Sequence, residues 1–162
     1  MENGVLIILG IDPGTAITGW GVLEKRAKGR TLTIGYGCIK TSPGEDMEKR
    51  LLVKYLEITK ILKKYQPHAL ALERLFFNTN IKTAISVGQA RGVVMLAAAE
   101  KHVPIFEYTA LQAKLIITGY GRAKKKEMQL KVADYLGIKE KIKPDDVADA
   151  LAMAITHISK TG

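Results

Sequence analysis

The residues best suited to chemistry in this sequence are carboxylates that stand where a buried core has no use for charge. Asp12 follows the apolar run of residues 5–11, and Glu73 ends a second apolar run. Asp146 and Asp149 stand three positions apart in a helical pattern, so their side chains face the same way. Carboxylates at the ends of buried strands are costly to desolvate unless a cation meets them.

A convergence of these acids would create a metal site. If the strands that end at Asp12 and Glu73 are neighbours, and the last helix packs against them, four negative charges meet. Divalent cations relieve such repulsion most simply, and all-oxygen ligands favour Mg²⁺ or Mn²⁺ over zinc. Two ions about 3.5–4 Å apart activate a water and stabilise the leaving oxygen in phosphodiester hydrolysis. Asp12, Glu73, Asp146 and Asp149 therefore predict a site for two Mg²⁺ or Mn²⁺ ions that is suited to phosphodiester hydrolysis.

Each acid also has a simpler interpretation. The segment Asp12-Pro13-Gly14 is typical of a turn, and Glu73 would pair with any nearby arginine or lysine. Asp145 and Asp146 would cap the last helix and oppose its dipole, and the extra acid leaves the choice between these two open. Asp149 lies one turn further on, where capping no longer needs it. The conjunction of all four acids favours the metal site.

The elements that must position these acids follow from the apolar pattern. Strands are predicted at 5–11, 18–25 and 31–41 as an antiparallel meander, followed by strands at 69–73 and 104–108. A helix is predicted from a capping box of Ser42 and Glu45 to Tyr65. Further helices are predicted at residues 80–102, 109–117, 124–136 and 145–159. This order predicts one α/β domain over residues 1–162, with a mixed sheet of about five strands and helices on both faces.

The charge balance indicates a polyanionic partner. Lysine and arginine number 25 against 16 acidic residues, a net charge of +9. Nucleic acid, an anionic membrane or an acidic protein would each fit this excess, and solubility alone is the simpler explanation. The only cysteine, Cys38, excludes an intrachain disulfide and a cysteine-based zinc cluster. No signal peptide or apolar stretch of about 20 residues is visible, which predicts a cytoplasmic protein without a membrane partner.

Several short motifs span nearly the whole chain. The motifs are Gly10-Ile11-Asp12-Pro13-Gly14-Thr15, Thr18-Gly19-Trp20-Gly21-Val22, Ala71-Leu72-Glu73-Arg74-Leu75-Phe76, Gly88-Gln89-Ala90-Arg91-Gly92, Phe106-Glu107-Tyr108 and Asp146-Val147-Ala148-Asp149-Ala150-Leu151-Ala152. Together they resemble the RuvC family of Holliday-junction resolvases, in which such motifs occur in the same order.

The resemblance implies an RNase H-like fold and a structure-selective endonuclease of recombination and repair. Such an enzyme cuts four-way DNA junctions by paired, symmetric nicks. The four carboxylates named above would be the catalytic residues and would bind two Mg²⁺ ions, with Mn²⁺ as an alternative. Some family members carry His where Asp146 stands, so this position should be the most permissive. The family also implies a homodimer and a branch-migration partner of the RuvA and RuvB type.

Basic and aromatic residues outside the carboxylates are candidates for DNA binding. Lys114, Arg122, Lys124 and Lys125 gather after the last strand, where they would bind phosphates or form a solvated helix face. By resemblance, Lys114 and Lys125 contact DNA near the cut. Phe76 matches a family position that engages bases at the junction centre; it would otherwise anchor its loop in the core.

One stretch of small residues has two possible partners. Gly88, Gly92, Ala97 and Ala98 would permit close approach of their helix either to the sheet or to a second subunit. The sequence does not separate these, although the resemblance implies a two-fold dimer through this region.

Two other functional classes compete with the resolvase. The glycine-containing turn after Asp12 is also similar to the phosphate loop of an actin-like ATPase or sugar kinase. Those proteins need two lobes and a far longer chain, and the late pair of aspartates would then lack a role. A non-catalytic nucleic-acid-binding module would gain nothing from four acids beside phosphates.

Overall fold

The computed structural model describes residues 4–74 and 80–162 as ten helices and strands. Their order along the chain is βββαβαβααα, as the sequence predicts. The elements are β1 (Val5–Asp12), β2 (Ile17–Arg26), β3 (Thr31–Lys40), α1 (Met47–Tyr65), β4 (Ala69–Glu73), α2 (Ile81–Glu100), β5 (Ile105–Tyr108), α3 (Ala110–Thr118), α4 (Lys125–Leu136) and α5 (Asp145–Thr161).

The strands form one mixed sheet in the order β3-β2-β1-β4-β5. The first three are the predicted antiparallel meander, whereas β4 and β5 add in parallel on the other side of β1. The central strands β1 and β4 read as nearly continuous apolar runs because both of their faces are covered.

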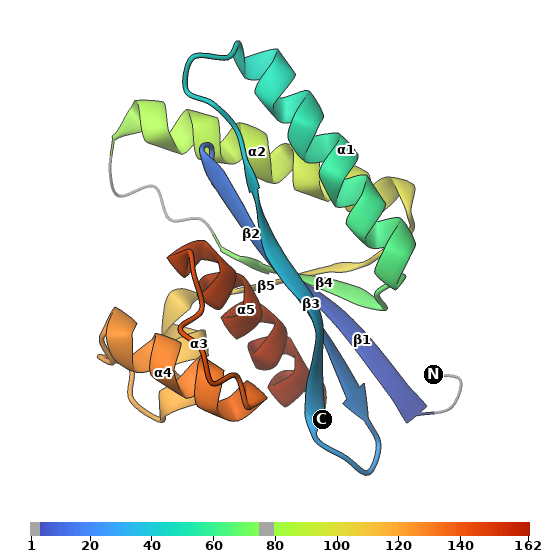
Figure 1. Ribbon diagram of the computed structural model, residues 1–162, viewed down its shortest axis with the longest axis vertical. Coiled ribbons are helices and arrows are strands. Elements are labelled where there is room, and N and C mark those ends of the chain that lie inside the picture. The colour runs from blue at the N-terminus through green and yellow to red at the C-terminus, as the bar shows by residue number, and fades with distance from the viewer. Residues whose placement is uncertain (1–3, 75–79) are drawn as a thin grey trace.

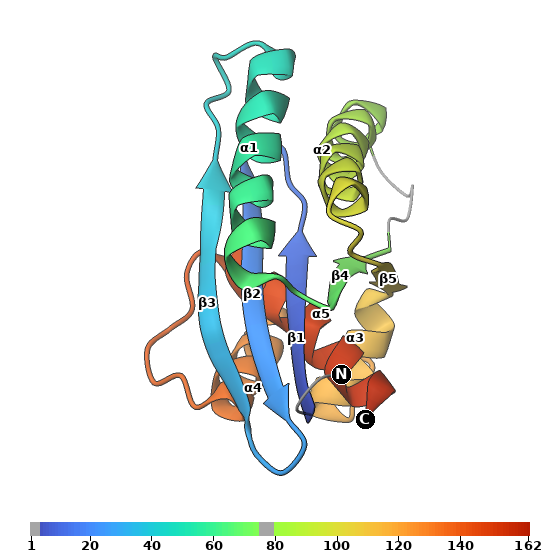
Figure 2. The same ribbon diagram turned by 90° about the vertical axis from the view of Figure 1, so that its right-hand side faces the viewer.

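Helices cover both faces of the sheet, as predicted. Helices α1 and α2 pack on one face, and α3, α4 and α5 pack on the other (Figures 1 and 2). Two apolar cores result. One, between the sheet and α1 and α2, includes Leu9, Ile58 and Val94, and the other, beneath α5, includes Ile8 and Leu151. Among the described residues, no helix has the length and apolar character needed to cross a membrane.

Helix α5 lies unusually close to the sheet because glycines face it. A Cβ built at Gly10 would overlap the carbonyl oxygen of Ala150, and one built at Gly19 would overlap that of Asp146. The backbone of α5 therefore rests directly on β1 and β2. Residues 147–158 of α5 form its buried part, apart from the half-buried Asp149.

The predicted start of α1 is wrong. The helix begins at Met47 with Asp46 as its N-cap, so Ser42 does not cap it. Instead, the Glu45 N–H donates to the carbonyl oxygen of Ser42 at 3.1 Å, and the Gly44 N–H donates to its hydroxyl at 3.4 Å. These local bonds close a turn, and they engage the Ser42 hydroxyl and the Glu45 N–H, which a capping box would have joined to each other.

Two cations lie buried where α1 meets the turn after β1. The Lys54 side chain is fully buried, and its Nζ donates to Thr18 Oγ1 at 3.2 Å. Thr18 Oγ1 in turn donates to the carbonyl oxygen of Gly14 at 3.0 Å. Arg50, also buried, donates through Nε to Thr41 Oγ1 at 3.0 Å. In the described part of the chain, neither cation forms an ion pair with a carboxylate.

The glycine contact predicts that Gly19→Ala destabilises the protein. The added methyl would push α5 away from β2, and overpacking of this kind costs about 1–3 kcal/mol. Thermal denaturation of the purified variant measures the effect. Gly44→Ala is the matched control, since its Cβ would meet its nearest neighbour at 3.9 Å. A Gly19→Ala variant as stable as Gly44→Ala would contradict the close packing of α5.

Burial of Lys54 predicts that the free energy of unfolding of the protein depends on pH, and that Lys54→Met removes this dependence. Burial, and then the charge of Arg50, lower the pKa of Lys54 from 10.5 to about 8. Between these values the unfolded chain holds a proton that the folded chain lacks, so stability rises with pH across this window. Below pH 8 the folded protein carries the whole penalty of a buried charge. Lys54→Met should therefore stabilise the protein at pH 7 by about 1–4 kcal/mol.

The gain from Lys54→Met should shrink as the pH rises from about 8 towards 10.5, which urea denaturation at several pH values measures. Lys63→Met, an exposed position on the same helix, should show no such trend. A gain that is equal at all pH values would contradict the assignment to charge burial.

Candidate active site

Two of the predicted acids end adjacent parallel strands. Ile11 of β1 pairs with Leu72 of β4, and the next residue on each strand is Asp12 and Glu73. Parallel strands present their carboxyl ends at the same edge of a sheet, which is why these two acids become neighbours. The structure thus brings together residues that lie 61 positions apart in the sequence.

The other two acids come from the first turns of α5. Asp12 pairs with Gly19 across β1 and β2, and the carbonyl of Asp146 lies directly over Gly19. The start of α5 is therefore fixed beside the end of β1. Asp146 and Asp149 are both half-buried there.

Convergence of the four acids is visible in their electrostatics. Burial, and then the charges of Asp149, Asp146 and Glu73, raise the pKa of Asp12 from 3.8 to about 8. Burial raises the pKa of Asp149 to about 6, although Lys125 opposes this. Burial also raises the pKa of Glu73, while Lys114 lowers it. Asp12 therefore holds a proton at neutral pH in the absence of cations.

The four acids lie close enough to interact electrostatically, but their side chains do not yet form a coordination shell. Across residues 4–74 and 80–162, no three His, Cys, Asp or Glu side chains already form a set that could hold a metal ion. Rotation of the carboxylates toward a common centre would be needed to complete such a set.

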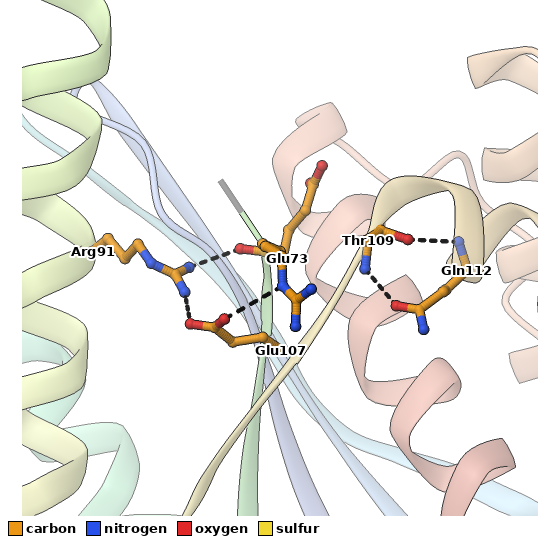
Figure 3. A network of polar contacts seen from close by, with 6 residues as sticks. Glu73, Arg91, Glu107, Thr109 and Gln112 are labelled. Carbon is orange, nitrogen blue, oxygen red and sulfur yellow. Dashed lines mark hydrogen bonds and ion pairs between the residues drawn. The ribbon is translucent and has the colours of Figure 1, made fainter. Parts of the chain in front are cut away.

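The end of β4 is held by a polar network with α2 and β5 (Figure 3). Arg91, a buried residue of α2, donates through Nη1 to the carbonyl oxygen of Glu73 at 2.7 Å. The same guanidinium forms an ion pair with Glu107, which also lies 3.7 Å from Arg74. The Glu73 carboxylate points away from Arg91, so the network fixes the backbone and leaves the side chain free of it.

Arg91 and Glu107 were not singled out as positioning residues from the sequence. Both stand in the motifs quoted above, within Gly88-Gln89-Ala90-Arg91-Gly92 and Phe106-Glu107-Tyr108. The signal available in the sequence was an arginine within a run of small and apolar residues, where a charged side chain is unusual.

A hollow of about 240 Å³ opens beside Glu73 and Asp149, between α3, α4 and α5. Lys114 and Lys125 line it together with these two acids. Helix α3, which carries Lys114, starts with a capping box in which Thr109 Oγ1 accepts from the Gln112 N–H at 3.0 Å (Figure 3). Two of the predicted DNA-binding lysines thus stand next to the carboxylates.

Asp145 and Asp146 lie in different surroundings. Asp145 is exposed and lies 3.3 Å from Lys125 Nζ. Hydrogen bonds from Lys125 and Gln129 lower the pKa of Asp145, whereas the negative charge of Asp146 acts on Asp12. The charge of Asp149 is the largest influence that raises the pKa of Lys125. Asp145 therefore belongs with Lys125, and Asp146 belongs with the acids.

The remaining predicted DNA-binding residues lie further out. Arg122 and Lys124 are exposed in the connection from α3 to α4, and neither lines the hollow beside Glu73. Lys124 is the N-cap residue of α4. Phe76 falls in residues 75–79, which lie outside the described part of the chain.

Comparisons with known proteins identify a family for this chain. The family model for crossover junction endodeoxyribonuclease RuvC matches residues 8–157. A crossover junction endodeoxyribonuclease RuvC from Moorella thermoacetica is 52% identical over 154 residues, which cover 95% of this chain and 92% of that protein.

Solved structures give the same result. The structure of Thermus thermophilus RuvC matches with a TM-score of 0.89 and 36% identity, covering 96% of this chain and 95% of that chain. T. thermophilus RuvC in complex with a Holliday junction substrate matches with a TM-score of 0.91 and 35% identity, covering 96% and 94%. The predicted RNase H-like fold is therefore confirmed. The chain belongs to the RuvC family of crossover junction endodeoxyribonucleases.

Proposed function

We propose that this chain is a junction-resolving endonuclease that cuts four-way DNA by metal-dependent hydrolysis of phosphodiester bonds. Its whole length, residues 1–162, acts as one nuclease domain in recombination and repair. The observation that carries the proposal is the meeting of Asp12, Glu73, Asp146 and Asp149 at one edge of the sheet, beside two lysines. The family membership supports four-way DNA as the substrate. T. thermophilus RuvC, which matches with a TM-score of 0.91, was solved in complex with a Holliday junction substrate.

The donor set fits divalent cations. The charges of Asp149, Asp146 and Glu73 raise the pKa of Asp12, so the four carboxylates are unfavourable together when ionised, and a cation removes this penalty. Asp12, Glu73, Asp146 and Asp149 would hold two Mg²⁺ ions, or Mn²⁺, because hard cations prefer all-oxygen ligands. When bound, the ions supply Lewis-acid stabilisation and an activated water.

The chain's own groups prepare the site for this chemistry. Asp12 holds a proton at neutral pH and releases it when positive charge arrives. The contact from Arg91 fixes the backbone of Glu73, so its carboxylate starts from a defined position. Lys114 and Lys125, at the rim of the hollow beside Glu73, bind the phosphates of the strand that is cut.

A homodimer is the second part of the proposal. The outward side of α2 carries an apolar seam at spacings of three and four residues, formed by Ile81, Ile85, Gly88, Gly92 and Met95. A Cβ at either glycine would meet nothing within 4 Å, whereas Ala97 and Ala98 are buried against the sheet. The alanines thus pack in the core against the sheet, and the glycines face outward. A two-fold contact through this seam supplies two active sites for two symmetric nicks.

The remaining partners rest on the family alone. A branch-migration complex of the RuvA and RuvB type would deliver the junction, and the enzyme would act in the cytoplasm, where the bacterial chromosome lies. The basic excess of +9 supports DNA as the polyanion.

The metal-site proposal predicts that Asp12→Asn abolishes cleavage while junction binding is retained. The amide keeps the shape but cannot supply the charge that the cations need, so cleavage should fall by about a hundredfold or more. Incubation of a synthetic four-way junction with Mg²⁺ measures cutting, and gel-shift titration in EDTA measures binding. The wild type should give paired symmetric nicks in the junction, none in linear duplex and none with EDTA.

Asp134→Asn on α4 is the matched control, because this exposed aspartate lies outside the site. It should cleave like the wild type. Near-normal cleavage by Asp12→Asn would refute the site, and tight binding without cleavage by the wild type, with Mn²⁺ as well, would favour a non-catalytic binding module.

The phosphate contact of Lys125 predicts a change in salt dependence. Lys125→Ala should lower the slope of log Kd against log salt concentration by about 0.9, the value for one lost phosphate contact on duplex DNA. Stability should barely change, because the exposed pair with Asp145 contributes about 1 kcal/mol or less. Lys131→Ala, exposed on the same helix, should keep the wild-type slope. An unchanged slope in Lys125→Ala would assign Lys125 to the solvated helix face.

The apolar seam predicts that Ile85→Glu yields a monomer. Ile85 is 58% exposed, so the change leaves the core intact but places charge in the proposed contact. Light scattering on a gel-filtration column should give about twice 17.8 kDa for the wild type and 17.8 kDa for the variant. Leu130→Glu, on α4 and 63% exposed, should remain a dimer. A monomeric wild type at tens of micromolar would refute the dimer.

A further inference from the structure

A second hollow adjoins the carboxylates on the side of Asp146. It measures about 700 Å³ and is lined by three lysines that come from separate segments. Lys40 is the last residue of β3, and Lys141 and Lys143 lie in the connection between α4 and α5. The sequence did not suggest this cluster, because about a hundred residues separate its two parts.

The sheet register explains why Lys40 reaches this hollow. Asp12 pairs with Gly19, and Gly19 pairs with Cys38, so these residues lie in one row across three strands and face the same side. Lys40 follows Cys38 by two positions and shares that side. The row therefore leads from the catalytic aspartate to the edge of the sheet, where the lysine stands.

The hollow keeps its positive charge. In the described part of the chain, Lys40, Lys141 and Lys143 form no ion pair, and all three are exposed. Two acids also line the hollow, but Asp145 is paired with Lys125 and Asp146 belongs to the carboxylate group. Three lysines are therefore available to an anion that approaches from solvent.

The acids thus stand between two lysine-lined hollows. Lys114 lies on the side of Glu73 and Asp149, and the new cluster lies on the side of Asp146. Lys125 stands between the two hollows, because it lines the first and pairs with Asp145, which lines the second. A DNA strand held at the carboxylates continues in both directions from the bond that is cut and carries a phosphate at every nucleotide. One hollow can serve only one of these directions.

We infer that the hollow lined by Lys40, Lys141 and Lys143 binds backbone phosphates of the cleaved strand on the opposite side of the cut from Lys114. This inference rests on the proposed function, because it names how the substrate of that same site is held. The contact is to phosphate and not to bases, so it adds affinity without sequence preference.

Paired lysine variants test the inference. The double variant Lys141→Ala with Lys143→Ala should weaken junction binding about tenfold or more at moderate salt and lower the salt slope by about 1 to 2. The loss should be equal for junctions of different sequence. The control is Lys28→Ala with Lys63→Ala, which removes the same charge from two exposed positions, one in the turn before β3 and one on α1. The control should keep the wild-type slope.

Cys38 provides a direct reporter, because the only cysteine of the chain lines this hollow. In EDTA, where the DNA stays uncut, saturating junction should slow alkylation of Cys38 by iodoacetamide several-fold. The Lys141→Ala/Lys143→Ala variant, saturated with the same junction, should lose most of this protection.

Two results would overturn the inference. One is a wild-type salt slope in the Lys141→Ala/Lys143→Ala variant, and the other is an alkylation rate of Cys38 that junction DNA does not change. Either result, with a wild type that still cleaves junctions, would leave the proposed function standing and remove only the second phosphate site. A wild type that does not cleave at all would instead refute the proposed function.

Discussion

The backbone of α5 touches the backbone of β1 and β2, and this contact exists because glycines occupy the facing positions. Side chains at Gly10 and Gly19 would occupy the same space as the carbonyl groups of Ala150 and Asp146. A helix normally packs about 10 Å from a sheet through layers of side chains. Here the layer is missing at two points, and the first turns of α5 are lowered onto the end of β1. The site depends on this approach, since two of its four acids come from α5.

The same approach creates an electrostatic problem. Asp12 is half-buried and lies among three other acids, and its pKa rises to about 8 as a result. Such an arrangement is unfavourable for folding and is retained where function requires it. Two lysines offset part of this repulsion, because Lys114 lowers the pKa of Glu73 and Lys125 lowers the pKa of Asp149. Neither lysine lies among the acids, so the centre remains suited to small divalent cations.

Much of this organisation could be predicted from the sequence. Apolar runs that end in a single acid located β1 and β4, and the spacing of Asp146 and Asp149 placed both on one side of a helix. The register that brings Asp12 beside Glu73 was not predictable, because strand order is decided by packing between distant segments. The start of α1 was missed for a local reason, since Ser42 satisfies a turn instead of a helix.

The partners of the small residues on α2 also depend on contacts between distant segments. Gly88, Gly92, Ala97 and Ala98 were equivalent in the sequence, and only the tertiary structure separates outward glycines from inward alanines. The lysine cluster beside Asp146 was not predictable for a similar reason. Lys40 and Lys143 line the same hollow, but they are far apart in the sequence. Side chains that one element carries were predictable as a group from their spacing. Side chains that the fold assembles were predictable only where each was unusual at its own position, as the four acids were.

The central claim is that α5 brings its aspartates close enough to Asp12 for a cation to replace a proton there. Calorimetric titration of the DNA-free protein with Mn²⁺ at pH 7, in two buffers of different ionisation enthalpy, measures the protons released on binding. We expect binding with release of about one proton per site, because Asp12 is mostly protonated at this pH and must ionise to bind metal. In Asp12→Asn this release should vanish. Binding without proton release, or no binding at all, would contradict the account.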